Sequence, residues 1–114
     1  AGIEVAIISG RRSAAVDRRM EELGVRHVFQ GIQDKLAVFR DLTGRLGIEP
    51  AEVAYLGDDL PDLDVMRVVG LPAATGDAHP DLLPHATWTS RRPGGHGAVR
   101  EFCDLLLAAR AGAA

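Results

Sequence analysis

The sequence predicts an α/β fold of three layers, in which a parallel sheet has helices on both faces. Short aliphatic runs alternate with amphipathic segments along all 114 residues, and the connections between them are short. The first run, at 3–8, is almost continuously aliphatic, which is typical of a strand covered on both sides. A chain of this length can bury one core, so we expect a single domain over residues 1–114.

Each predicted element has a recognisable start or stop. Ser13 and Asp34 stand directly before apolar periodic segments, where side-chain oxygens cap helices. Gly24 and Gly47 follow the last apolar positions of those segments and are expected to end the helices. Pro61 suits the first turn of a short helix. The predicted helices are 13–23, 34–46, 61–69 and 98–110, and the predicted strands are 3–8, 26–29, 53–56, 71–75 and 86–89.

The composition excludes several classes of function. The net charge of −3 offers no basic surface for nucleic acid. No apolar run reaches the roughly 18 residues that cross a bilayer, and we find no signal peptide, so we expect no membrane partner. Cys103 is the single cysteine, which permits no internal disulfide and suits a reducing compartment. We therefore expect a cytoplasmic protein.

Polar residues stand where the predicted strands end. Ser9 ends the first strand, Lys35 opens the second helix, and Asp58, Asp59 and Asp62 follow the third strand. In parallel sheets these places share one edge, and ligands gather there. Carboxylates beside a helix N-terminus suit a hard cation and a phosphate group. We therefore expect these side chains to meet in one site.

The acidic cluster has two interpretations. Asp59 and Asp62 suit the cap and the dipole of the following helix. However, Asp58, Asp59, Asp62 and Asp64 are four acids within seven residues, which is more than capping requires. Like charges at such spacing repel unless a cation offsets them. We therefore predict a site for a hard cation, with Asp58, Asp59 and Asp62 as its ligand set.

Three motifs in this order resemble the haloacid dehalogenase superfamily of phosphotransferases: IISGR at 7–11, DKL at 34–36 and GDDLPDL at 57–63. GDAHP at 76–80 and GGHGAVRE at 94–101 resemble its capless phosphatases that act on 3-deoxy-D-manno-octulosonate 8-phosphate. The resemblance covers essentially the whole chain. It implies a Rossmann-like fold of the capless type and a Mg²⁺-dependent phosphatase of lipopolysaccharide precursor synthesis. It also implies a homotetramer.

The resemblance assigns roles to the motif residues. In this superfamily an aspartate attacks phosphorus, and Mg²⁺ bridges enzyme and phosphate. Asp58 matches the metal-ligating aspartate, and Asp62 would support the metal from the second shell or through water. Ser9, Gly10 and neighbouring amides would bind the phosphoryl oxygens. Lys35 would pair with phosphate and nucleophile and neutralise charge in the transition state.

Two arginines are candidate substrate ligands. Arg11 and Arg19 lie eight residues apart, on one stripe of the first predicted helix. The resemblance implies that they hold the carboxylate and the phosphate of a phosphorylated sugar acid. Alternatively, both are ordinary surface arginines.

The superfamily's first motif, an Asp-x-Asp that ends the first strand and supplies the nucleophile, has no counterpart before Ile3. The only such pattern, at 62–64, follows the wrong element. We therefore expect an N-terminally incomplete domain that lacks its first strand and the hairpin after it, and that is inactive alone. Three alternatives stay open: a sialic or nonulosonic acid phosphatase, a phosphatase-like module of a cytidylyltransferase, and an inactive assembly module.

Overall fold

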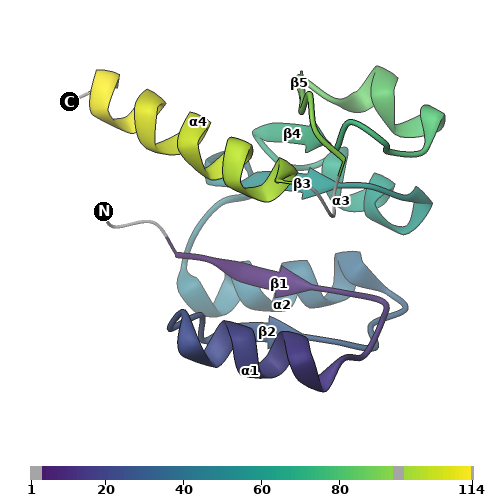
Figure 1. The fold of residues 1–114 in the computed structure, drawn as a ribbon, viewed down its shortest axis with the longest axis vertical. Helices are drawn as coiled ribbons and strands as arrows, with labels where there is room; N and C mark the ends of the chain where they lie inside the picture. The colour runs from purple at the N-terminus through teal and green to yellow at the C-terminus, as the bar shows by residue number, and fades with distance from the viewer. Residues whose placement is uncertain (1–3, 94–96, 114) are drawn as a thin grey trace.

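The structure is a computed structural model that describes residues 4–93 and 97–113, with side chains as far as residue 108. Strands and helices alternate along the chain, as the sequence predicts (Figure 1). The strands are β1 (Ala6–Ile8), β2 (His27–Phe29), β3 (Ala54–Gly57), β4 (Leu71–Ala74) and β5 (Trp88–Thr89). The helices are α1 (Ala14–Glu22), α2 (Lys35–Leu46), α3 (Leu63–Met66) and α4 (Ala98–Ala113), with 3₁₀ turns η1 (Pro50–Glu52), η2 (Leu60–Asp62) and η3 (Pro80–His85).

The helix boundaries follow the predicted caps. The Ser13 side chain accepts a hydrogen bond from the Val16 amide at the start of α1. Asp34 accepts one from the Ala37 amide, at 3.1 Å, at the start of α2. Gly47 ends α2 with φ +68°, in the left-handed region where glycine is favoured. The predicted strand at 3–8 is described as a strand only from residue 6, and the Gly94–Gly97 loop lies mostly outside the described residues.

All described strand pairs are parallel, and they form two sheets. β1 pairs with β2, with Ile7 opposite Val28. β3 pairs with β4, with Leu56 opposite Ala73, and β4 pairs with β5. Within the described ranges β1 and β3 are not paired with each other, and Figure 1 places them as the inner strands of the two sheets. The single predicted sheet is therefore divided between β1 and β3.

Apolar packing joins the two sheets on one face. Phe39 of α2, Val65 of α3 and Val69 form a buried group, called the core cluster below. Ile8 of β1 and Tyr55 of β3 both pack against it. Both sheets therefore contact the same apolar cluster under α2 and α3, and this contact brings the ends of β1 and β3 toward the same side.

The last helix is attached through β5. The rings of Trp88 and Phe102 stack with centroids 5.7 Å apart. Glu101 accepts hydrogen bonds from the Arg91 amide and the Ser90 hydroxyl, at 2.9 and 3.0 Å, and the Arg91 contact leads in lowering the pKa of Glu101. Within 4–93 and 97–113, no helix is long and apolar enough for a membrane span.

Gly70, just before β4, has no room for a side chain. A Cβ atom there would lie 2.0 Å from the backbone oxygen of Ala51, so we expect Gly70→Ala to lower the free energy of unfolding by about 1–3 kcal/mol. Gly44 in α2 has nothing within 4 Å of the same position. Gly44→Ala, the matched control, should raise stability by about 0.5–1 kcal/mol because alanine favours a helix. Urea unfolding of both variants measures the difference, and equal effects would contradict the packing argument.

Candidate phosphate and metal site

The site begins at the end of β3, where a glycine makes room for a carboxylate. A Cβ atom on Gly57 would lie 2.8 Å from Cβ of Asp62 and 3.0 Å from the sulfur of Met66. Because Gly57 has no side chain, Asp62 can pack against the end of the strand. Asp58 and Asp59 follow β3, and the 3₁₀ turn η2 then brings Asp62 back next to them.

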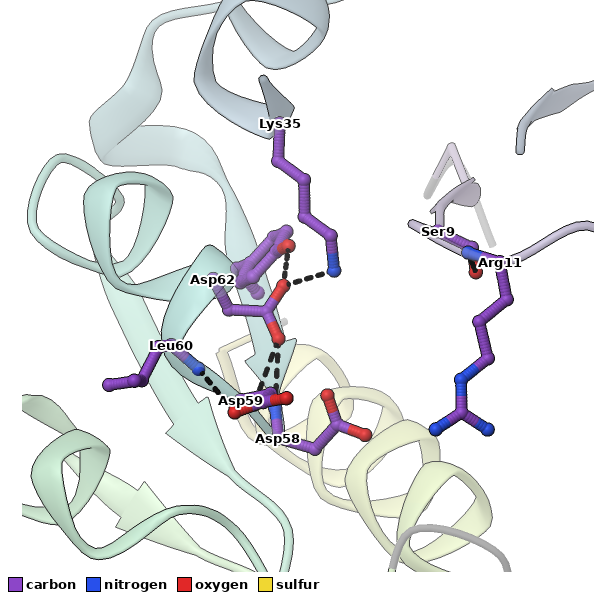
Figure 2. Close-up of polar contacts among 8 residues, drawn as sticks. Ser9, Arg11, Lys35, Asp58, Asp59, Leu60 and Asp62 are labelled. Atoms are coloured by element: carbon purple, nitrogen blue, oxygen red, sulfur yellow. Dashed lines mark hydrogen bonds and ion pairs between the residues drawn. The ribbon is translucent and has the colours of Figure 1, made fainter. Parts of the chain in front are cut away.

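Asp62 is 2% exposed, and each oxygen of its carboxylate accepts two hydrogen bonds. Oδ1 accepts from Lys35 Nζ at 2.8 Å and from Tyr55 Oη at 2.5 Å. Oδ2 accepts from the amides of Asp58 and Asp59, at 3.0 and 3.3 Å (Figure 2). A carboxylate offers about four lone-pair directions, and all are used here. This geometry favours a supporting role for Asp62 over direct metal ligation.

Asp58 and Asp62 have opposite pKa shifts. Burial alone would raise the pKa of Asp62, but hydrogen bonds from Lys35 and Tyr55 outweigh it and lower that pKa. Burial raises the pKa of Asp58, and the neighbouring Asp62 carboxylate adds to the increase. Ionised Asp58 therefore lacks full compensation from its surroundings, and a bound cation would supply it.

Asp59 has a local role at the start of η2. Its Oδ1 atom accepts from the Leu60 amide at 2.8 Å, and its own amide donates to Asp62. Among the described residues, no three His, Cys, Asp or Glu side chains are grouped to hold a metal ion. The predicted set of Asp58, Asp59 and Asp62 is therefore not a preformed cluster of three ligands, and Asp58 is the acid whose side chain faces the open side in Figure 2.

The end of β1 supplies the opposite side. Ser9 Oγ accepts from the Arg11 amide at 3.1 Å, which tightens the turn through Gly10. In Figure 2 the Lys35 ammonium, the Asp58 carboxylate and the Arg11 guanidinium face a common space in front of Ser9. The Ser9 hydroxyl itself is directed at the Arg11 amide, so the convergence of residues 9, 35 and 58 on one ligand stays a prediction.

Arg11 lies before α1 (Ala14–Glu22), so the prediction that Arg11 and Arg19 share one stripe of a helix is wrong. Arg19 itself lies on α1. Its guanidinium lies 3.4 Å from Glu22, and both side chains are about two-thirds exposed. The structure thus gives Arg19 a surface ion pair on α1. Such pairs contribute little to stability, so Arg19 could exchange Glu22 for another anion.

Sequence reasoning missed two contacts. Tyr55, which also packs against the core cluster, donates to Asp62. Side chains two apart in a strand share a face. Tyr55 is two residues before Gly57, and it therefore lies on the face of β3 against which Asp62 packs. The second contact is a hydrogen bond of 2.9 Å from the His79 amide to the Asp58 carbonyl oxygen. It connects the segment after β4 to the candidate site.

A family model for haloacid dehalogenase-like hydrolases matches residues 27–101. The chain belongs to the haloacid dehalogenase-like hydrolases. This match includes the segments that hold Lys35, Asp58 and Asp62, and the membership confirms the fold class that the sequence predicts.

Named relatives within this family are closely similar to the chain. The 3-deoxy-D-manno-octulosonate 8-phosphate phosphatase KdsC of Escherichia coli K12 is 54% identical over 108 residues, which cover 95% of this chain and 57% of the relative. The Moraxella catarrhalis phosphatase of the same name, solved with magnesium, phosphate and KDO, is 46% identical with a TM-score of 0.91, over 95% of this chain and 62% of that one.

A third relative adds a second divalent metal. The cobalt-bound deoxy-D-mannose-octulosonate 8-phosphate phosphatase of Haemophilus influenzae is 34% identical with a TM-score of 0.88, and the match covers 96% of this chain and 62% of that one. The chain therefore spans about three-fifths of the length of these relatives.

The buried pair of Lys35 and Asp62 makes a stability prediction. Their side chains are 10% and 3% exposed. Asp62→Asn should lower the free energy of unfolding by about 3–5 kcal/mol, because it leaves a buried ammonium unpaired. In either orientation of the new side chain, its NH₂ group would also face hydrogen-bond donors where an acceptor is needed.

Asp64→Asn is the matched control, since Asp64 pairs with Arg67 at 3.7 Å on the surface. Its loss should cost less than about 1 kcal/mol. Denaturant unfolding at pH 7 compares the two variants. Similar losses in both would contradict the assignment of Lys35 and Asp62 as a buried pair.

Proposed function

We propose that the protein containing this chain is a Mg²⁺-dependent phosphatase that hydrolyses 3-deoxy-D-manno-octulosonate 8-phosphate to the free sugar acid and phosphate. The observation that carries the proposal is the placement of Lys35. Its ammonium is buried against Asp62 and faces the same space as Asp58 and Arg11 (Figure 2). The phosphatases that resemble this chain at 54% and 46% identity support the choice of substrate.

The residues of this chain would bind and polarise the phosphoryl group. Ser9 and the backbone amides around Gly10 would donate to its oxygens, and Lys35 would offset the negative charge that spreads over them during transfer. Lys35 Nζ has three donors, of which one bonds Asp62. The others remain available for oxygens of the substrate and of the nucleophile.

Asp58 is the residue of this chain that we expect to hold Mg²⁺ directly. A hard cation prefers carboxylate oxygen, and the raised pKa of Asp58 is the property of a carboxylate that gains from one. When bound, the metal supplies charge neutralisation for the phosphoryl oxygens. Asp62 would support this arrangement by holding the Asp58 amide, and Asp59 stays a predicted member of the metal site.

The nucleophile is expected in the part of the relatives' length that this chain does not span. We propose that an Asp-x-Asp strand lies between β1 and β3. Support comes from the two sheets, whose inner strands are not paired with each other within the described ranges. A parallel strand placed there would put its carboxyl end beside Ser9, Lys35 and Asp58, since the strands of each sheet are parallel and β1 and β3 point the same way in Figure 1.

Other predictions for the whole protein remain to be tested. A related sialic or nonulosonic acid phosphatase, or a phosphatase-like module of a cytidylyltransferase, would prefer a different sugar acid phosphate in a substrate panel. An inactive assembly module would hydrolyse none of them. The predicted cytoplasmic homotetramer is tested by fractionation and by light scattering of the purified protein.

Lys35→Ala and Asp58→Ala should each abolish phosphate release from octulosonate 8-phosphate, a fall of roughly a hundredfold or more, because each removes charge stabilisation of the transition state. EDTA should have the same effect, and Mg²⁺ should reverse it. Arg45→Ala, which removes an exposed cation paired with Asp41 on α2, is the control and should keep full activity. Near-native turnover in both site variants, with the fold intact by circular dichroism, would refute the assignment.

Arg19→Ala should raise KM more than it lowers kcat if Arg19 binds the ground-state sugar acid. Arg18→Ala, its exposed neighbour on the same helix, is the matched control and should change neither constant. Steady-state kinetics on octulosonate 8-phosphate separates the two. An unchanged KM in Arg19→Ala would restrict Arg19 to its ion pair with Glu22.

A further inference from the structure

The mechanism proposed above gives no role to the hydroxyl of the half-buried Tyr55. The hydroxyl of Tyr55 donates to Asp62 Oδ1, the same oxygen that accepts from Lys35 Nζ. The ring packs against the core cluster. Apolar packing requires a ring of this size but not its hydroxyl, and phenylalanine would fill the position without burying a polar atom.

The shared oxygen connects Tyr55 to Lys35. Asp62 Oδ1 has two lone pairs, and the hydroxyl takes one while the ammonium takes the other. The second carboxylate oxygen is held by two backbone amides, so the carboxylate is fixed at both ends. Burial raises the pKa of Tyr55, and its hydroxyl therefore remains a donor. These contacts hold the Lys35 ammonium on the side of Asp62 that faces Ser9 and Arg11 in Figure 2.

We propose that Tyr55 is a positioning residue for phosphoryl transfer, which acts through Asp62 to hold the Lys35 ammonium toward the phosphoryl group. This inference rests on the proposed phosphatase function. The hydroxyl takes up part of the carboxylate's charge, so its removal strengthens the attraction of Asp62 for Lys35 and draws the ammonium away from the phosphoryl oxygens. The effect falls on the transition state, because charge on those oxygens grows there.

Tyr55→Phe in the complete protein tests the proposal, with p-nitrophenyl phosphate as a substrate that does not depend on the identity of the sugar acid. We expect kcat to fall about tenfold while KM changes less than about twofold, as for an interaction made in the transition state. Orthovanadate, which adopts the five-coordinate geometry of the transferring group, should inhibit about tenfold more weakly. Inhibition by inorganic phosphate should change little.

Val69→Ala is the matched control for packing. It removes volume from the core cluster against which the Tyr55 ring packs, and it leaves the hydrogen bonds of Asp62 in place. It should lower the melting temperature at least as much as Tyr55→Phe and keep kcat within about twofold, since lost packing acts on stability. Equal losses of kcat in both variants would overturn the positioning role.

A double-mutant cycle with Lys35→Ala tests whether Tyr55 acts through Lys35. The affinity for orthovanadate is measured by thermal shift, which does not depend on turnover. If Tyr55 acts through Lys35, Tyr55→Phe weakens vanadate binding in the native background and has no further effect in Lys35→Ala. The same weakening in both backgrounds, or none in either, overturns the inference. Vanadate binding by a protein that hydrolyses neither p-nitrophenyl phosphate nor octulosonate 8-phosphate would refute the phosphatase proposal, whereas the cycle would still decide whether Tyr55 orients Lys35 toward a bound oxyanion.

Discussion

Burying the carboxylate of Asp62 is unfavourable in itself, and the geometry of the site follows from how the fold offsets that cost. A charge at 2% exposure must be paired and hydrogen-bonded. The partners come from the first turn of α2, from the middle of β3 and from the turn after it. Satisfying one carboxylate therefore fixes an ammonium, a hydroxyl and two backbone amides relative to one another.

This arrangement separates the roles of aspartates in one short motif. Asp62 gains donors that favour its ionised form, whereas Asp58, which is exposed, is left beside a negative charge that helps to raise its pKa. Two carboxyl groups whose pKa values are driven apart by their environments generally do different work. Here the inner one organises the backbone, and the outer one is directed toward the space that a ligand would enter. Asp59 caps the intervening turn.

Local signals in the sequence were sufficient for most of the fold. Ser13, Asp34 and Gly47 act within a few residues of themselves, so their caps are predictable from composition and spacing. The convergence of strand ends was predictable because parallel strands share an edge. The partners of Asp62 were not, because Lys35 is 27 residues away in sequence and aspartate clusters look alike whether they bind metal or backbone. The surface pairing of Arg19 depends on one rotamer, which spacing does not determine.

Helix α2 contributes one residue to the candidate site and another to the apolar cluster that both sheets contact. Lys35 stands at its first turn, and Phe39, one turn later, lies in the apolar group that touches Ile8 and Tyr55. Phe39 thus belongs to the apolar contact that joins the half of the molecule that ends in Ser9 to the half that ends in Asp58. The two halves are therefore held together, within the described residues, by hydrocarbon contacts that lie away from the polar groups of the candidate site.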